Sequence, residues 1–372
     1  MVNISFTGDI LPNERINNIL NNDYSLCFNL ATKLKNCDYL VGNLDTPVAG
    51  EELLYTHERY CFNTPDGILK ALNDAGFDML TLANNHCMDR DEEGIAKTLE
   101  NCRKYGFDTI GIYASTEDRN KVFVKEINDI KIAFVNYTYG TNAFAHGRFL
   151  RNDYMVNLLQ PEETKKGSIH LLNSYEKIAE DLNRIYTEKT DEYDIVLPYL
   201  ERLKSDITQA KQNADYVIAI IHNGSQHIEK VDPYSRFVAQ KIKEFGADII
   251  VGHHQHIIQS CDTSDDYLKI FCLGNFYSDN RIDVGSYYFD KPLYNAVFHL
   301  NLRKNENGKI EAEKSFSIYT TVTTPDGIPS AIDSADVFKI KDEHHLRSDI
   351  LRYANLLAGV QKYNEVRERY EL

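Results

Sequence analysis

The sequence predicts a layered α/β fold with a ligand-binding edge. Short apolar runs rich in Val, Ile and Phe recur along the 372 residues, and helical segments separate several of them. Elements that alternate in this way are typical of α/β proteins. Several of the runs lead directly into Gly, Asp, Asn or His. Because open α/β sheets bind ligands beyond the carboxyl ends of their strands, these polar residues are expected to meet at one edge.

The apolar runs have the length and composition of strands that are buried on both faces. They cover 2–10, 38–41, 77–82, 108–112, 131–135, 216–221, 247–251 and 268–273. Farther along, two alternating runs at 295–302 and 310–322 are separated by Asn307 and Gly308. Asn-Gly between alternating runs predicts a β-hairpin.

Helix boundaries are predicted by capping residues. Asp232 precedes a proline and an apolar stripe that ends at Gly246, the pattern of an N-cap, a first-turn proline and a C-terminal glycine. A second helix is predicted to end before Gly76. A third is predicted between Asp91, as its N-cap, and Gly106.

One domain is predicted to cover 1–330. Within it, about 144–202 is rich in polar helical sequence and is predicted to be a helical insertion. The final segment, 331–372, is predicted to be a helical extension that packs on the same domain, with 365–371 as an exposed helix end. Because insertions over a rigid scaffold often carry specificity, the insertion is the predicted determinant of substrate choice.

Composition narrows the classes of function. The net charge is −15, whereas a protein that binds nucleic acid normally presents a basic face, so no nucleic-acid partner is expected. No apolar stretch approaches the roughly 18 residues of a membrane-spanning helix, and no leader is recognised, so we expect a cytoplasmic protein. The seven cysteines form no Cys-x-x-Cys pair, which favours reduced thiols. An anionic substrate would need a local positive centre, which a metal supplies.

The polar residues that follow the runs are of metal-binding types. They are Asp9, Asn43, Asp45, Asn84, Asn85, His86, Asp89, His222, His253, His254, His256 and Asn275. Imidazole and carboxylate groups are the usual ligands of Zn, Mn and Fe. A divalent ion at this edge would polarise a phosphoryl or carbonyl oxygen and lower the pKa of bound water.

Each of these residues taken alone also has a structural explanation. Asp9 or Asp45 can start a turn, and Asn85 can cap a helix. His222 alone is more often a partly buried histidine than a ligand. The segment 252–256 differs, because three histidines within four residues at a strand end have few structural uses. The combined pattern predicts a functional site more specifically than any one of these residues does.

These stretches resemble the CapA family, named for bacterial capsule and poly-γ-glutamate synthesis and related to calcineurin-like metallophosphatases. The matching segments are 6–10, 42–47, 82–86 with Asp89 and Gly94, 221–224, 245–256 and 273–276. The resemblance implies a four-layer α/β/β/α metallophosphatase-like sandwich.

The resemblance also implies roles for the residues and one or two divalent ions (Mn, Zn or Fe). Asp9 and His256 would hold the first ion, and Asn85, His222 and His254 the second. Asp45 is the carboxylate nearest to the bridging position, and His86 would protonate the leaving group with Asp89 beside it. Asn43, Asn84, His253 and Asn275 would support these groups.

Three functions remain open. The first is a metal-dependent hydrolase of phosphoester, ester or amide bonds, linked to poly-γ-glutamate or capsule polymer metabolism and acting on an anionic small molecule or polymer. The second is a non-enzymatic accessory protein for capsule or polyglutamate synthesis with a vestigial metal site. Leu11 favours the second, because calcineurin-like enzymes usually carry histidine there. The intact Asn85 and His86 favour the first. A nucleotidase-type phosphatase is the third, supported only by the shared fold.

Overall fold

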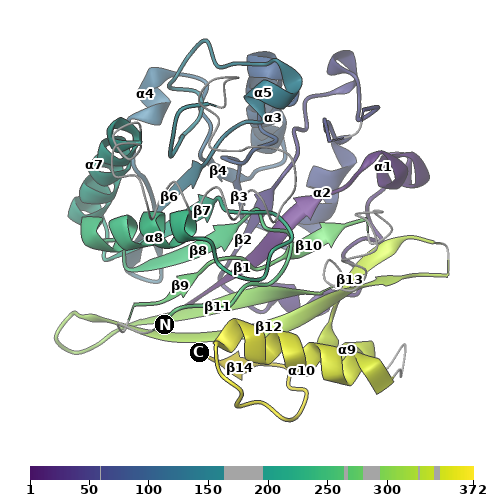
Figure 1. The fold of residues 1–372 in the computed structure, drawn as a ribbon, viewed down its shortest axis with the longest axis vertical. Helices are drawn as coiled ribbons and strands as arrows, with labels where there is room; N and C mark the ends of the chain where they lie inside the picture. The colour runs from purple at the N-terminus through teal and green to yellow at the C-terminus, as the bar shows by residue number, and fades with distance from the viewer. Residues whose placement is uncertain (59, 163–195, 264–266, 280–293, 326, 339–343) are drawn as a thin grey trace.

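The computed structural model describes residues 1–58, 60–162, 196–263, 267–279, 294–325, 327–338 and 344–372. Two β-sheets pack face to face, and helices cover the outer face of each (Figure 1). This is the four-layer α/β/β/α arrangement that the resemblance implies. Among the helices in the described part of the chain, none combines the length and apolar character that a membrane crossing requires.

The first sheet runs in the order β13-β12-β11-β1-β2-β3-β4, with β10 beside β1 and β14 beside β12. Its parallel part consists of β1 (Val2–Leu11), β2 (Tyr39–Leu44), β3 (Met79–Thr81), β4 (Asp108–Ile110) and β10 (Asn275–Ser278). Its antiparallel part consists of β11 (Tyr294–Lys304), β12 (Ile310–Thr323), β13 (Pro329–Asp333) and β14 (Tyr370–Glu371).

The second sheet runs in the order β5-β6-β7-β8-β9. These strands are β5 (Phe123–Ile127), β6 (Ile130–Thr138), β7 (Tyr216–His222), β8 (Ile249–His253) and β9 (Lys269–Ile270). All pair in parallel except β5 with β6.

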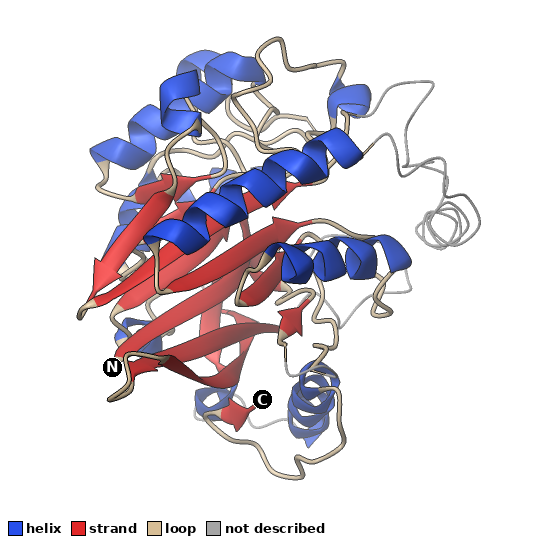
Figure 2. Cartoon of the chain, turned by 90° about the vertical axis from the view of Figure 1, so that its left-hand side faces the viewer, coloured by secondary structure: helices blue, strands red, loops and turns tan. Residues whose placement is uncertain are grey.

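The helices fall into two outer layers and a C-terminal group. They are α1 (Glu14–Leu20), η1 (Thr32–Lys35), η2 (Glu51–Leu53), α2 (Gly67–Asp74), α3 (Asp91–Lys104), α4 (Thr116–Arg119), α5 (Ala143–His146), α7 (Leu197–Asn213), α8 (Pro233–Phe245), α9 (Ser334–Val337) and α10 (His344–Ala358). Figure 2 looks from the side of α7 and α8, where helices cover the second sheet.

Alternation along single strands produces the layers, because successive side chains of a strand point to opposite faces. In β7, Ile218 and Ile220 belong to the core between the two sheets. The residues that alternate with them, Val217 and Ala219, pack with α7 and α8 on the outer face. Strands buried on both faces were predicted from their continuous apolar sequence, and the structure confirms them.

The predicted hairpin and the cap of α8 are confirmed. β11 and β12 pair from Tyr294 with Thr320 to Lys304 with Ile310, and Gly308 in the turn has a φ of 78°. The third predicted boundary is displaced by one residue, because Asp91 is already the first residue of α3, preceded by Arg90.

The start of α8 depends on Asp232. Its side chain accepts a hydrogen bond from Ser235 N at 2.9 Å and a second from Ser235 Oγ at 2.9 Å. We expect Asp232→Ala to lower the free energy of unfolding by about 0.5–2 kcal/mol, because loss of an N-cap leaves backbone N–H groups unpaired. Urea denaturation measures this. Asp74→Ala, at an exposed aspartate, is the control and should change the free energy of unfolding by less than about 0.5 kcal/mol.

The tail at 365–371 is not a helix end, so that prediction was wrong. Tyr370 pairs with Phe316 in β14 and β12, is fully buried and stacks on the Phe316 ring at 5.2 Å between ring centres. The buried aromatic pair outweighs the local charged sequence. Of the predicted insertion, 163–195 lies outside the described residues. Helix α7, which begins within it, covers the second sheet.

Candidate metal centre

Strand ends from both sheets deliver the polar residues to one place. Asp9 in β1 pairs with Asn43 of β2 on one side and with Asn275 of β10 on the other. His222 ends β7 and pairs with His253 at the end of β8. The two sheets face each other, so these ends meet across the rim of the sandwich.

Asp9 is fully buried and surrounded by donors. Its Oδ1 accepts from Asn43 Nδ2 at 2.7 Å, and His253 Nδ1 lies 3.1 Å from the same oxygen. Its Oδ2 accepts from the backbone N–H of His254 at 3.1 Å, with His256 Nδ1 at 3.5 Å. Burial raises the pKa of Asp9, but the bond to His253 and the charges of His253 and His256 outweigh burial and hold the pKa below its usual value.

A second group forms around His222. Its Nε2 lies 2.7 Å from Asn85 Oδ1, 3.1 Å from His254 Nδ1 and 3.7 Å from Asp45 Oδ1. Burial, then repulsion from the neighbouring histidines, lowers the pKa of His222 well below its usual value. The imidazole is therefore neutral, which is the form that binds metals.

Asp45 lies between the two groups. Its carboxylate, Asp9 and His256 offer ligand atoms that all lie within 4.8 Å of one another. Asp45 is fully buried, and neither of its oxygens has a hydrogen-bond partner among the described residues. Burial, together with the charges of Asp9 and Asp89, raises the pKa of Asp45 well above its usual value although His86 opposes this.

A buried carboxylate without donors is costly unless a cation accompanies it. We define the candidate centre as Asp9, Asp45, Asn85, His222, His254 and His256. Its oxygen and nitrogen atoms are of the kinds that Zn, Mn and Fe bind as ligands. The orphaned oxygens of Asp45 and the neutral imidazole of His222 thus fit a divalent ion.

Replacing Asp45 with asparagine should separate stability from metal binding. We expect Asp45→Asn to stabilise the metal-free protein by at least about 1 kcal/mol at pH 7, because the folded wild type must either bury the Asp45 charge or take up a proton, and asparagine requires neither. The gain is absent below about pH 4, where unfolded aspartate is protonated, and grows as the pH rises toward the higher folded pKa. Urea unfolding in chelator measures this gain. In the same variant, metal affinity should fall.

His86 and Asp89 form a pair beside the centre. His86 Nδ1 lies 2.8 Å from Asp89 Oδ2, which also accepts from the backbone N–H of Phe62 at 2.7 Å. Burial lowers the pKa of His86, but the charge and hydrogen bond of Asp89 outweigh it and raise the pKa above its usual value. Because Nδ1 faces Asp89, Nε2 is the nitrogen left to act on a substrate.

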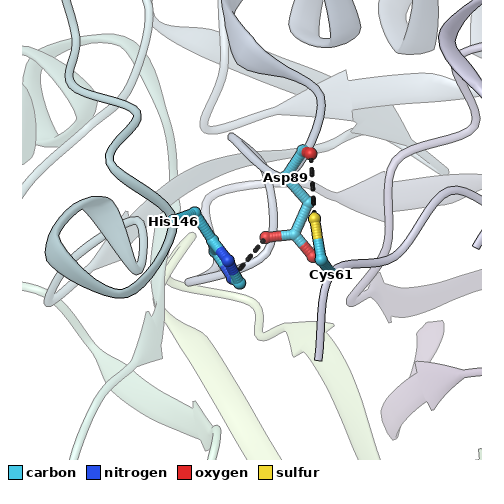
Figure 3. A group of neighbouring side chains, drawn as sticks. All are labelled: Cys61, Asp89 and His146. Carbon is cyan, nitrogen blue, oxygen red and sulfur yellow. Dashed lines mark hydrogen bonds and ion pairs between the residues drawn. The ribbon is translucent and has the colours of Figure 1, made fainter. Parts of the chain in front are cut away.

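Behind this pair lies a group that sequence reasoning missed. In Figure 3, Cys61 and His146 approach Asp89 from two sides. Cys61 Sγ lies 3.3 Å from the backbone oxygen of Asp89, and His146 Nε2 lies 3.7 Å from Asp89 Oδ1. Arg90 Nη1 lies 2.9 Å and Arg148 Nη1 3.2 Å from the same sulfur. Cys61 lies in a loop and His146 at the end of α5, far apart in the sequence, and no local pattern links them.

The four supporting residues lie against the centre or the pair, and one of them, His253, is the neighbour of Asp9 Oδ1 described above. Asn43 contacts Asp9 and lies 3.4 Å from His222 Nδ1. Asn84 binds the backbone oxygen of Leu44 at 2.8 Å and accepts from His86 N at 3.2 Å. Asn275 Oδ1 lies 2.7 Å from His256 Nδ1.

The backbone at the histidine segment is unusual. His254 has a φ of 102° and His256 a φ of 59°, which places both in the left-handed region that non-glycine residues rarely adopt.

Leu11, the position at which a histidine was expected from the resemblance, is a buried residue of β1 opposite Ser278. The histidines that contact Asp9 are instead His253 and His256.

The four layers, with His, Asp and Asn side chains gathered at the strand ends, define a metallophosphatase-like α/β protein. The chain belongs to the family described as bacterial capsule synthesis protein PGA_cap, which matches residues 3–280. It is 26% identical over 342 residues to the capsule biosynthesis protein CapA of Bacillus anthracis, covering 90% of this chain and 72% of that protein. It is 23% identical over 315 residues to the PGA biosynthesis protein CapA of Bacillus subtilis strain 168, covering 84% and 70%.

Two solved structures are also similar. A hypothetical protein from Thermus thermophilus has 14% identity and a TM-score of 0.43, covering 86% of this chain and 99% of that one. GAP50, the anchor in the inner membrane complex of Plasmodium, has 12% identity and a TM-score of 0.41, covering 85% of each.

Proposed function

We propose that this protein is a metal-dependent hydrolase of phosphoester, ester or amide bonds that serves poly-γ-glutamate or capsule polymer metabolism. One observation carries the proposal: the buried Asp45 carboxylate, without a donor among the described residues, lies between two sets of ligand atoms. A structural role for Asp45 would require donors to its oxygens. One or two divalent ions would satisfy these oxygens without such donors.

The chain's own residues divide the work. Asp9, Asp45 and His256 would hold one ion, and Asn85, His222 and His254, with Asp45, the other. An ion bound there supplies charge that polarises the scissile group and lowers the pKa of a water.

His86 would protonate the leaving group. Asp89 orients the His86 imidazole through a hydrogen bond and raises its pKa, which favours the protonated form. Asn84, through its bond to His86 N, fixes the turn that carries this acid.

An anionic substrate fits the charges around the acid. Arg90 and Arg148 meet at Cys61, next to Asp89. Arg148 is half-buried and lies two residues after His146, the last residue of α5. Two guanidinium groups beside the acid would attract an anionic leaving group in a chain whose net charge is −15.

A non-enzymatic accessory role in capsule or polyglutamate synthesis is the second candidate. Leu11 favours it, because an aliphatic side chain there offers no ligand to the ion at Asp9. In that case the ion would hold the strand ends together without turnover.

The decisive experiment combines metal content with turnover. Purified protein is analysed for Mn, Zn and Fe by mass spectrometry and assayed with bis-p-nitrophenyl phosphate, p-nitrophenyl phosphate and γ-glutamyl p-nitroanilide. We expect about one or two bound ions per chain and hydrolysis that a chelator abolishes. Metal without turnover of any substrate would favour the accessory role. No metal after reconstitution would refute the hydrolase and leave the accessory role, with a vestigial metal site, ahead.

A further inference from the structure

Asp89 has one carboxylate oxygen that the pair with His86 does not use. Its Oδ2 accepts from His86 and from the backbone N–H of Phe62. Its Oδ1 is buried and has no hydrogen-bond partner among the described residues. Leaving a buried carboxylate oxygen unpaired is unfavourable, and a carboxylate held through one oxygen can still pivot about it. A residue that donates to Oδ1 would therefore fix Asp89 and, through it, the His86 ring.

His146 is placed to donate to this oxygen. Figure 3 shows its side chain extending from α5 toward Asp89. The His146 Nε2 atom lies 3.7 Å from Asp89 Oδ1, slightly beyond hydrogen-bond range. Catalytic hydrogen bonds are often long in the unliganded protein and shorten when the substrate binds. The gap between these two atoms is therefore of the kind that substrate binding closes.

The neutral form of His146 suits this task. Burial lowers the pKa of His146, and the charge of Asp89 only partly opposes this effect, so the ring is uncharged at neutral pH. A neutral imidazole still has one N–H to donate. It can thus orient Asp89 without neutralising the carboxylate, whereas a permanent positive charge at this position would weaken the attraction between Asp89 and His86.

Two acceptors compete for the single N–H of neutral His146, namely Asp89 Oδ1 and the backbone of Tyr60. A hydrogen bond to a carboxylate is roughly twice as strong as one between neutral groups. Tyr60 is also 48% exposed, whereas Asp89 is fully buried, so water is more available to Tyr60. Both differences favour a proton on Nε2, the nitrogen that faces Asp89.

A cation is a poorer occupant of this place. Cys61, Asp89 and His146 do offer ligand atoms that lie within 4.8 Å of one another. However, the guanidinium groups of Arg90 and Arg148 lie 2.9 Å and 3.2 Å from Cys61 Sγ. Two positive charges at this distance repel a metal ion. The geometry therefore favours direct contact between His146 and Asp89.

The segment that carries His146 is fastened at both ends by one carboxylate. Glu162 accepts from Thr141 Oγ1 at 2.6 Å and from the backbone N–H of Leu150 at 2.9 Å. Between these two residues the chain forms α5, which ends at His146. Removing the fastening should let His146 move away from Asp89.

We propose that His146 is a positioning residue of the acid pair: it holds Asp89, and Asp89 holds His86. This inference rests on the proposed hydrolase function, because His86 needs a fixed orientation where it protonates a leaving group. Glu162 contributes indirectly, by keeping the segment 141–150 in place.

Kinetics of the metal-loaded full chain test the proposal. His146→Ala should lower kcat on phenyl phosphate about tenfold, the factor that loss of a hydrogen bond to a charged group implies. The loss should be smaller on p-nitrophenyl phosphate, whose leaving group needs less protonation, while KM and metal content stay at the wild-type level. His146→Gln, whose amide can donate to the same oxygen, should restore most of the rate. Phe144→Ala, at an exposed residue of the same helix, is the matched control and should change neither rate.

A double-mutant cycle tests the role of the fastening. Glu162→Ala should lower the rate on phenyl phosphate in the wild-type background but not in the His146→Ala background, because both changes act through the same contact. Additive losses would show that Glu162 acts independently of His146 and would contradict this part of the proposal.

Ring NMR spectra of the zinc-loaded protein test the contact without turnover. The wild type should carry the His146 proton on Nε2, a result that does not depend on whether any variant folds. The His86 Nδ1–H proton should exchange with water faster in His146→Ala than in the wild type. A wild type that hydrolyses neither ester would refute the proposed function, and the spectra would then decide the contact by themselves. A His146 proton on Nδ1, an unchanged His86 proton, equal losses on both esters or no rescue by His146→Gln would overturn the positioning role.

Discussion

Replacing His254 and His256 together with alanine is expected to remove the bound metal and abolish hydrolysis. His254 lies in the group around His222, and His256 in the group around Asp9, so the double variant removes a nitrogen ligand from both. Mutating a residue that only hydrogen-bonds to a metal ligand already weakens metal binding about 10–100-fold. We therefore expect a loss of metal affinity greater than about 100-fold, measured by mass spectrometry and metal titration.

His57→Ala is the matched control, because His57 is exposed and lies outside the candidate centre. It should bind metal as the wild type does. Circular dichroism of both variants without metal shows whether each is folded. A folded double variant with unchanged metal content would rule out this centre as the metal site.

The second large effect is expected from the acid pair. Asp89→Asn and His86→Asn should lower kcat about 10²–10⁴-fold, the usual contribution of a general acid, while metal content stays at the wild-type level. Asp89 bonds to His86 and Phe62, so its loss disturbs the acid and leaves the ligands in place.

The leaving group distinguishes an acid from a merely structural residue. Phenyl phosphate needs protonation of its leaving oxygen more than p-nitrophenyl phosphate does, so the variants should lose more activity on phenyl phosphate. Asp118→Asn, at a half-exposed aspartate of α4, should change neither rate. Equal losses on both substrates would contradict the assignment of His86 as the acid.

Local sequence was sufficient for much of the fold. Apolar runs predicted most strands of both sheets but not β5, β10, β13 or β14, Asn307 and Gly308 predicted the hairpin, and Asp232 predicted the cap of α8. Each of these signals depends on neighbours along the chain. The polar residues at strand ends were also predicted to meet, because parallel strands bring their carboxyl ends to one rim.

What the sequence could not predict depends on contacts between distant segments. Tyr370 forms a strand because its ring packs on Phe316, which no pattern within 365–371 indicates. Cys61, in a loop, and His146, at the end of α5, reach Asp89 from segments far apart in the sequence.

The left-handed backbone at His254 and His256 should make the flexibility of this segment depend on metal binding at the candidate centre. Such a conformation costs about 1–3 kcal/mol at each residue, and ions bound to the two imidazoles would offset that cost. Without the ion, this short stretch is where the chain relaxes first, ahead of the strands on either side. Amide hydrogen exchange at 252–258 should therefore rise when the ion leaves and fall when it returns, so the peptide backbone itself records whether the protein is loaded.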